Sequence, residues 1–480
     1  MALGKNIIYN SVLTVSNYLI PLIVFPYISR TLGVEGLGKA SFVESIINFV
    51  LLFSMFGIYN LGVREIAKSK NDPQALNNTY SSLFALNTIN TFIVFFIFIV
   101  AINFIPRFSE YKQILYLGSF NIIFNLFLIQ WLFVGIEQFK FIVLRTIILR
   151  LLYVIAIFLF IKKPEDYAIY YILSVALVFF NALVNYIYSK KVVKFTFKGL
   201  SLKRFLGPYL FLGLYSILTS LYTTFNMTFL GLVADEREIG YYTTAVKVQS
   251  IFLALFTAIS TAIVPHMSSL VGANKQAEIR SVVNNTVGVV FSLGIPIVYC
   301  SMVLAPQIIF ILSGPGFSGA ILPLQIVMPT LLLIALAQIV ILQILMPFGN
   351  DKIILINTII GAVVGLALNF ALVKSFGASG AGMVWLVSEI VVYLLGHFVV
   401  MKKYKINTMS LLLLKHILWG GPYLIICFCL SLLPFSAFII LLLSLVCCLI
   451  YFCILQFTIY KDGLIAQISK RIIHKIFNYV

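Results

Sequence analysis

The chain has 480 residues, of which 61% are hydrophobic and only 10% are charged, and its mean hydropathy is +1.07. Soluble domains carry roughly 25% charged residues, so this composition excludes a soluble fold and predicts an all-α polytopic membrane protein. The formal net charge of +18 would suggest nucleic acid in a soluble protein, but here the positions of the charges matter more, and we expect no nucleic-acid partner.

Apolar runs of about 20 residues predict fourteen membrane spans in chain order. They lie near 7–30, 40–61, 81–104, 113–136, 141–161, 167–188, 207–233, 243–265, 282–304, 320–346, 353–373, 380–400, 416–434 and 436–459. Of the 33 Lys and Arg, 22 fall in loops on the side of the N-terminus, seven fall in loops on the other side, and four lie within spans. The positive-inside rule therefore predicts a multi-pass protein with both termini in the cytoplasm.

The first two spans carry polar side chains at helical spacing. Span one contains Asn17 on a polar stripe and two prolines, Pro21 and Pro26, which we expect to bend it, either as a gate or as a packing kink. In span two, one helical face carries Ser41, Glu44, Ser45 and Asn48. Such a face is unlikely to contact lipid, so we expect it to line a wet cavity.

A weaker echo of this pattern begins the second half of the chain. One face of span seven includes Thr219, Thr223 and Asn226, and one face of span eight includes Thr243, Lys247 and Ser250. These residues are predicted to line the same kind of cavity. The densest basic loop, at 190–206, lies between the two halves, and we interpret it as a topology signal attracted to anionic membrane lipid.

Charged residues inside the spans are the strongest functional candidates, because an intramembrane charge is costly unless it is paired or solvated. The cations Arg30, Arg145, Arg150 and Lys247 outnumber the acids Glu44 and Glu389. Arg145 and Lys247 each lie about one turn from a surface that their side chains can reach by snorkelling, whereas Arg150 is nearer the middle of the membrane. An electropositive cavity suits an anion, and arginine offers bidentate contacts to phosphate oxygens.

Span twelve presents Glu389, Tyr393 and His397 at i, i+4 and i+8. This spacing fits either a proton-handling pair or structural hydrogen bonds. The later spans contain several prolines and the turn at 313–319, which predict a broken or mobile region. The last two spans are almost wholly apolar and are expected to lie outside the functional core, followed by a basic cytoplasmic tail with Lys470, Arg471 and Lys475.

The chain shows no catalytic constellation, no Gly-rich phosphate loop and no metal-ligand spacing. All six cysteines lie in apolar spans, and we interpret them as small hydrophobes. We therefore expect no enzyme activity, no metal and no cofactor, with H⁺ or Na⁺ as the only candidate coupling ion. An ion-coupled membrane transporter fits these observations best.

Three stretches carry a resemblance to a known family. The run NIIYNSVLTVSNYLIPLIVFPYISRTLGVEGLGKASFVESI, then FGIYNLGVREIAK, and later YYTTAVKVQSIF resemble the Wzx-type O-antigen and polysaccharide flippases of the MOP exporter superfamily. The resemblance implies two six-helix lobes related by a pseudo-two-fold axis and arranged as a V, plus two C-terminal helices. On this chain that gives an N-lobe at 1–189, a basic linker at 190–206, a C-lobe at 207–404, and extra spans with the tail at 405–480.

The resemblance also implies a function. Such flippases move undecaprenyl-pyrophosphate-linked oligosaccharides of O-antigen or lipopolysaccharide type across the bacterial inner membrane by ion-coupled alternating access, and they serve polysaccharide polymerase and chain-length proteins. Arg30 and Lys247 match basic positions of the family's motifs and become candidates for binding pyrophosphate, and Glu44 becomes a coupling or gating carboxylate. Glu389 and His397 are further coupling candidates.

Two alternatives to the flippase differ in the cavity or the loops they require. A multidrug antiporter of the same superfamily would need an acidic or aromatic cavity, whereas here the bases outnumber the acids. A membrane glycosyltransferase or polysaccharide polymerase would need a large outward loop, and the largest outward loops predicted here have only about ten residues.

Overall fold

The computed structural model describes residues 2–409, 411–460, 463 and 465, and for 2–20 and 411 it describes the backbone alone. All regular secondary structure in these residues is helical, which confirms the predicted all-α class. The chain forms two compact units, Met1–Gly240 and Tyr241–Val480, which are described separately. The predicted boundary between the lobes, at 190–206, stays a prediction. The N-terminal compact unit ends later, at Gly240, and includes α8 (Leu202–Thr223) and α9 (Phe225–Val233).

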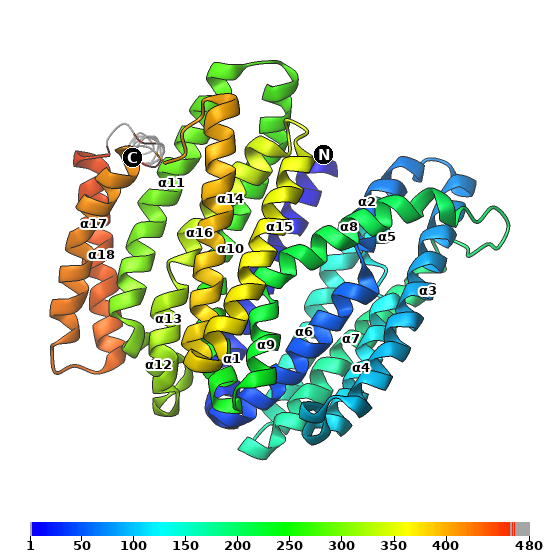
Figure 1. Cartoon of the computed structure of the whole chain (residues 1–480), viewed down its shortest axis with the longest axis horizontal. Coiled ribbons are helices and arrows are strands. Elements are labelled where there is room, and N and C mark those ends of the chain that lie inside the picture. Colours follow the sequence, from blue (N-terminus) through cyan, green and yellow to red (C-terminus); the bar gives the residue numbers. More distant parts are fainter. Residues whose placement is uncertain (1, 410, 461–462, 464, 466–480) are drawn as a thin grey trace, which may run out of the picture. The chain divides into compact units, whose positions relative to one another are not determined.

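The N-terminal unit is built around α1, which packs against α3, α4, α6 and α7. Figure 1 shows these helices from blue to green. Their bounds are α1 Ala2–Met55, α2 Ile58–Ser69, α3 Pro73–Phe104, η1 Pro106–Tyr111, α4 Lys112–Leu126, α5 Gln130–Gly135, α6 Phe139–Phe160, η2 Pro164–Asp166, α7 Tyr167–Ser189, α8 Leu202–Thr223 and α9 Phe225–Val233. Helix α10, Glu236–Gly272, begins here and continues into the second unit.

The C-terminal unit contains several broken helices between Ala305 and Tyr404. Its elements are α11 Gln276–Val303, α12 Ala305–Ser313, η3 Pro315–Ala320, α13 Ile321–Val327, α14 Thr330–Gln338, η4 Ile339–Leu345, α15 Asp351–Leu368, η5 Asn369–Val373, α16 Lys374–Tyr404, α17 Leu411–Ser431 and α18 Ala437–Thr458. Both η4 and η5 are π-helical turns. The predicted broken region around residues 313–319 is therefore confirmed as a run of short pieces.

Twelve helical stretches among the described residues are long and apolar enough to cross a membrane. Two of them, Pro21–Ser69 with 49 residues and Asp351–Tyr404 with 54, are too long for one span, since at about 1.5 Å per residue each exceeds 70 Å. Each is interrupted by a glycine with positive φ, Gly33 (φ 67°) and Gly377 (φ 52°). Dividing the two stretches there gives the predicted fourteen spans.

The interruption of α1 lies in the predicted connection between the spans at 7–30 and 40–61, and not at the two prolines. The helix continues through Pro21 and Pro26, and the non-helical residue is Gly33. A proline in a helix removes one backbone hydrogen bond, whereas a left-handed residue redirects the chain and is tolerated best at glycine. The glycine therefore separates spans one and two.

The basic loop after α7 is fastened to the start of α3 by hydrogen bonds from its own backbone. The amides of Lys194, Thr196 and Ser201 donate to Asn77 Oδ1 (2.8 Å), Ser81 Oγ (2.9 Å) and Ser82 Oγ (3.0 Å). Its backbone is thus fixed while Lys190, Lys194 and other basic side chains stay exposed.

The last two helices, α17 and α18, pack on each other and on α11 and α12. Figure 1 shows them in orange and red beside α11. The buried residues at these contacts include Leu304, Cys427, Ile440 and Leu455. The predicted basic tail with Lys470, Arg471 and Lys475 lies outside the described residues.

Candidate functional site

The polar face predicted for span two is partly buried in the N-terminal unit and partly exposed. Glu44 and Asn48 are exposed, whereas Ser41 and Ser45 are buried. The hydroxyl of Thr228 on α9 donates to the carbonyl of Ser45 (3.1 Å), and Ser45 Oγ donates to the carbonyl of Phe42 (2.8 Å). The four side chains span about 100° of arc, wider than one open face. The two serines therefore support packing in this structure, and only Glu44 and Asn48 are accessible.

The polar residues predicted in spans seven and eight are mostly bonded within their own helices. Thr219 and Thr223 donate to the carbonyls of Tyr215 and Thr219 (both 2.9 Å), and Ser250 donates to that of Val246 (2.7 Å). Asn226 and Thr243 are buried, which corrects their prediction as cavity-lining residues in this structure. Lys247 is exposed on α10. The side chain of Asn17 lies outside the described residues.

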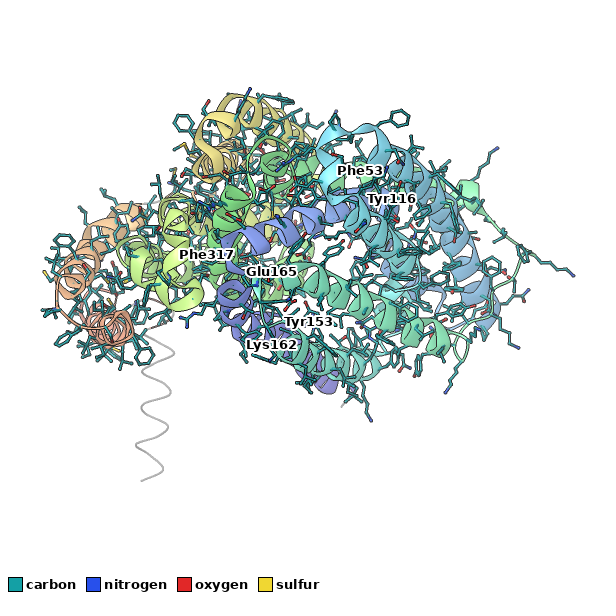
Figure 2. The ribbon with its side chains drawn as sticks, turned by 90° about the horizontal axis from the view of Figure 1, so that it is seen from below. Phe53, Tyr116, Tyr153, Lys162, Glu165 and Phe317 are labelled. Atoms are coloured by element: carbon teal, nitrogen blue, oxygen red, sulfur yellow. The ribbon has the colours of Figure 1, made fainter. Side chains whose placement is uncertain are left out.

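Glu44 faces three tyrosines in what we call the tyrosine cluster, Tyr153 on α6 with Tyr170 and Tyr171 on α7. The carboxylate interacts electrostatically with all three phenols, and Tyr153 and Tyr170 are hydrogen-bonded to each other. Figure 2 labels Tyr153 on α6, together with Lys162 and Glu165 in the connection that follows this helix. The cluster gives an exposed carboxylate a set of phenolic oxygens and hydroxyl donors, a chemistry that can hold a proton or a small cation.

The tyrosine cluster depends on close helix packing at Gly118 of α4. A Cβ atom at Gly118 would lie 2.5 Å from the hydroxyl of Tyr171 and 2.9 Å from Cγ1 of Ile47. Tyr171 is buried, so its hydroxyl cannot move into solvent to make room. The missing side chain of Gly118 thus lets α1, α4 and α7 meet behind Glu44.

The side chain of Arg145 lies inside the N-terminal unit and does not extend to the surface. It is buried, and its guanidinium donates to Asn185 Oδ1 on α7 and to Thr146 Oγ1 (3.0 Å). Asn185 in turn donates to the carbonyl of Leu128, which lies between α4 and α5. Arg145 therefore does not use the snorkelling route that its sequence position allows, because Asn185 on α7 and Thr146 on α6 hold its charge inside the unit.

Arg150 and Arg30 are more accessible than Arg145. Arg150 is half-buried on α6, one turn before Tyr153, and its charge interacts electrostatically with that of Arg145. Arg30 is exposed, three residues before the break at Gly33. On α6, Arg150 thus interacts with the buried Arg145, and Tyr153 one turn later interacts with Glu44 of α1, while Arg30 lies at the end of the first helix of α1.

In the C-terminal unit, the predicted Glu389–His397 pair is replaced by separate hydrogen bonds. Glu389 is buried and accepts from Trp385 Nε1 (3.2 Å). His397 Nδ1 contacts Thr408 Oγ1 (2.7 Å), which also contacts the hydroxyl of Tyr393 (3.2 Å). Eight helical residues separate Glu389 from His397 by about 12 Å along the axis, so each finds a nearer partner. The alternative of structural hydrogen bonds is the one observed.

Sequence reasoning missed two amide–hydroxyl pairs that join α10 to α14. Gln249 Nε2 donates to Thr330 Oγ1 (3.2 Å), and Gln338 Nε2 donates to Thr257 Oγ1 (3.0 Å). Gln249 and Thr257 are eight residues apart on α10, and Thr330 and Gln338 are eight residues apart on α14. This matching spacing can be recognised only when the two helices are compared with each other. Each pair gives the amide N–H group of a glutamine an acceptor that lipid could not provide.

Comparisons with known proteins agree with this architecture. The family model described as "Polysaccharide biosynthesis protein" matches residues 3–271, more than half of the chain, and the model described as "MatE" matches residues 212–371. A relative in Escherichia coli (strain K12) named "Putative O-antigen transporter" is 26% identical over 404 residues, covering 82% of this chain and 95% of that protein. The "Probable low-salt glycan biosynthesis flippase Agl15" of Haloferax volcanii is 27% identical over 173 residues, covering 35% of this chain and 36% of that protein.

Solved structures show the same fold at low identity. A structure titled "Lipid II flippase MurJ, inward closed conformation" superposes with a TM-score of 0.74 at 17% identity, covering 94% of this chain and 99% of that chain. An inward-facing multidrug resistance MATE family transporter of the MOP superfamily gives 0.65 at 19% identity, covering 83% and 99%. The names describe transporters and flippases rather than enzymes, as predicted. The match over more than half of its length shows that this multi-pass membrane chain belongs to the polysaccharide biosynthesis protein family.

Proposed function

We propose that the chain is a flippase for lipid-linked oligosaccharide. Its substrate is an undecaprenyl-pyrophosphate-linked repeat unit of O-antigen or another surface polysaccharide, moved from the cytoplasmic to the periplasmic leaflet of the bacterial inner membrane. Family membership and relatives named as O-antigen transporter and glycan flippase support this proposal. Both termini are cytoplasmic in this proposal, and the product is handed to polysaccharide polymerase and chain-length proteins.

The exposed position of Lys247 within an apolar helix is the observation that best supports the proposal. It is exposed on α10, a 37-residue helix otherwise uncharged between Glu238 and His266. A cation kept at such a position is costly in a membrane and therefore indicates a function, and a pyrophosphate supplies the compensating charge. In the N-terminal unit, Arg30 and Arg150 are further candidate cations for an anionic substrate group.

Coupling to H⁺ or Na⁺ is proposed at Glu44. Its carboxylate is exposed and interacts with three phenols, so protonation or a bound cation would remove the negative charge beside the tyrosine cluster. A change in charge that differs in energy between two conformations biases the equilibrium between them, which is what alternating access requires.

The first test is flipping in reconstituted liposomes. A fluorescent polyprenyl-pyrophosphate oligosaccharide is followed into the far leaflet for the wild type, Lys247→Ala, Lys247→Arg and the surface control Lys352→Ala. We expect at least a tenfold lower rate in Lys247→Ala, partial rescue by arginine because the charge is kept, and an unchanged rate in the control. An unchanged rate in Lys247→Ala would remove Lys247 from the anion site.

The coupling proposal is tested with an imposed ion gradient. Glu44→Gln cannot change charge, so its flipping rate should no longer respond to a proton or sodium gradient, whereas Glu35→Gln, an exposed acid nearby on α1, should respond like the wild type. A Glu44→Gln variant that still responds would move coupling to another group, with Glu389 the next candidate.

A multidrug or small-cation antiporter is the second candidate, favoured by the "MatE" match over residues 212–371. The same liposomes distinguish the two functions. Gradient-driven uptake of a small cationic dye, together with no movement of the lipid-linked probe in any condition, would replace the flippase by the antiporter.

A further inference from the structure

Three of the six cysteines meet in the C-terminal unit, although they are far apart in the sequence. Cys300 comes from α11, Cys427 from α17 and Cys448 from α18. The Sγ atom of Cys448 lies 3.5 Å from that of Cys300 and 3.7 Å from that of Cys427, and all three lie within 4.8 Å of one another. We call this set the thiol cluster.

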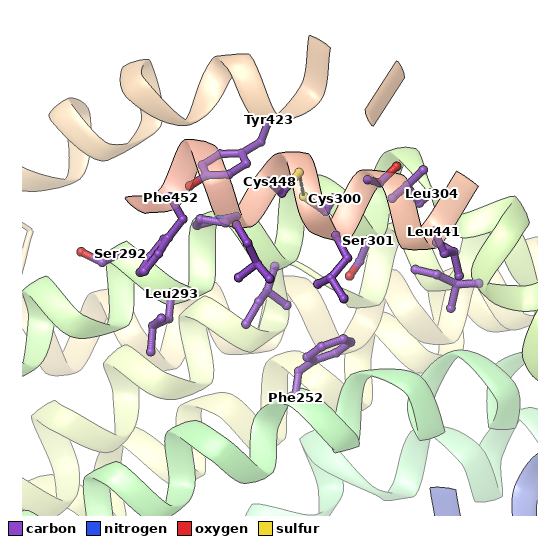
Figure 3. Close-up of a pocket in the computed structure, with 16 residues that line it drawn as sticks. Phe252, Ser292, Leu293, Cys300, Ser301, Leu304, Tyr423, Leu441, Cys448 and Phe452 are labelled. Atoms are coloured by element: carbon purple, nitrogen blue, oxygen red, sulfur yellow. Dashed lines mark hydrogen bonds between the residues drawn. The ribbon is translucent and has the colours of Figure 1, made fainter. Parts of the chain in front are cut away.

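The surroundings of the thiol cluster are mostly apolar, and the polar groups near it are hydroxyls, including those of Tyr423 and Ser444. Cys427 is fully buried, and Cys300 and Cys448 line a cavity of about 420 Å³ whose other walls include Phe252, Leu445 and Phe452. Tyr423 lies one turn before Cys427 on α17, and its buried hydroxyl has no hydrogen-bond partner among the described residues. Figure 3 shows Tyr423 beside Cys448 and Cys300, which a dashed line connects.

Three convergent sulfur atoms in an apolar site favour a soft metal ion. Thiolates select ions such as Cu(I), whereas oxygen ligands suit Mg²⁺ and Ca²⁺. Zn²⁺ takes four ligands in structural sites, and the cluster offers three sulfurs. A monovalent ion also limits the buried charge, because two thiolates and one neutral thiol around Cu(I) leave a single net negative charge. The Tyr423 hydroxyl is close enough to Cys300 and Cys448 to interact with that charge.

We propose that Cys300, Cys427 and Cys448 form a binding site for one Cu(I) ion that ties α17 and α18 to α11. Two of the thiols lose their protons to solvent as the ion binds, so binding strengthens as the pH rises. The cavity beside Cys300 and Cys448 provides the entry path. The site is separate from the cations and carboxylates assigned to flipping, and it stands whether or not the chain is a flippase.

The test uses the full-length chain, reduced and solubilised in detergent, with Cu(I) supplied from a chelator buffer. Copper per chain is measured after desalting for the wild type, Cys448→Ser, Cys300→Ser and Cys453→Ser. We expect a single copper ion in the wild type and at least a tenfold loss of affinity in the first two variants. Cys453→Ser is the matched control, because this cysteine is exposed on α18 outside the cluster, and it should bind like the wild type.

A second measurement separates loss of the site from loss of folding. Cu(I) should raise the unfolding temperature of the wild type and of Cys453→Ser, but not that of Cys448→Ser, while all variants elute as the same species without metal. Unchanged copper binding in both Cys448→Ser and Cys300→Ser would overturn the proposal. Absence of copper binding by the wild type, or equally tight binding of Zn²⁺, would overturn it as well.

Discussion

The two units hold their polar groups inside an apolar environment in different ways. In the N-terminal unit, charged groups come together: Arg145 is bonded to Asn185, and Glu44 faces the tyrosine cluster. In the C-terminal unit, neutral pairs such as Gln249–Thr330 and Gln338–Thr257 join helices, and the buried carboxylate of Glu389 is bonded to Trp385 on its own helix.

The two units also differ in the continuity of their helices. Apart from α1, which is broken at Gly33, the long N-terminal helices α3, α6 and α7 are continuous, whereas the C-terminal unit contains two π-helical turns and the short pieces α12, α13 and α14. Charges need fixed partners because an unpaired buried charge is costly, while neutral amide–hydroxyl pairs tolerate small helix movements. Among the described residues, the first unit thus holds a buried charge through a partner on a neighbouring helix, whereas the second joins α10 to α14 through neutral pairs and contains two π-helical turns.

The largest expected effect comes from removing the partner of a buried charge in the N-terminal unit. Asn185→Ala leaves Arg145 without its acceptor on α7 and should destabilise the fold by about 3 kcal/mol. The control is Asn181→Ala on the same helix, because the Asn181 amide donates only to the carbonyl of Leu177 (2.7 Å). Thermal unfolding in detergent measures both, and equal losses would show that the Arg145 contact has no special weight.

A smaller effect is expected where the tyrosine cluster is packed against α4. Gly118→Ala places a Cβ atom 2.5 Å from the hydroxyl of Tyr171, and such overpacking costs about 1–3 kcal/mol. Adding Tyr171→Phe removes the clashing oxygen and should recover part of the loss. Gly288→Ala on α11, where the Cβ meets only a Leu412 methyl at 3.6 Å, is the control and should be neutral or stabilising. A destabilised control with an unaffected Gly118→Ala would contradict this account.

The smallest effect should come from a neutral pair of the C-terminal unit. A double-mutant cycle with Gln338→Leu and Thr257→Val should give a coupling energy of about 0.6 kcal/mol, as is typical of hydrogen bonds between membrane helices. Unfolding temperatures of the four proteins provide the measurement. A coupling energy as large as the Asn185→Ala effect would remove the distinction between the two units.

The number and positions of the spans could be predicted from the sequence because bilayer thickness and local hydrophobicity set them. The breaks at 305–345 followed from proline and glycine, which act locally. The interruption of α1 at Gly33 lies in the predicted connection between spans one and two, whereas Pro21 and Pro26, which were expected to bend span one, leave the helix continuous.

The candidate site was predictable only in part. The spacing of residues in span two found Glu44 and Asn48, but it could not separate them from Ser41 and Ser45, whose burial depends on α9. The position of Arg145 depends on Asn185, forty residues later, and the thiol cluster depends on three helices that no sequence spacing connects. Contacts between distant helices were therefore the part that the sequence did not reveal.

The single-residue breaks at Gly33 and Gly377 have a consequence for biosynthesis. The helices on either side of each glycine follow one another without a polar loop, and the helical stretches that contain them, of 49 and 54 residues, exceed the roughly 45 Å of a whole bilayer. The ribosome therefore delivers two spans before any long hydrophilic connection emerges, and each stretch must enter the bilayer as a helical hairpin. A polar insertion at either glycine would let the two spans enter one at a time.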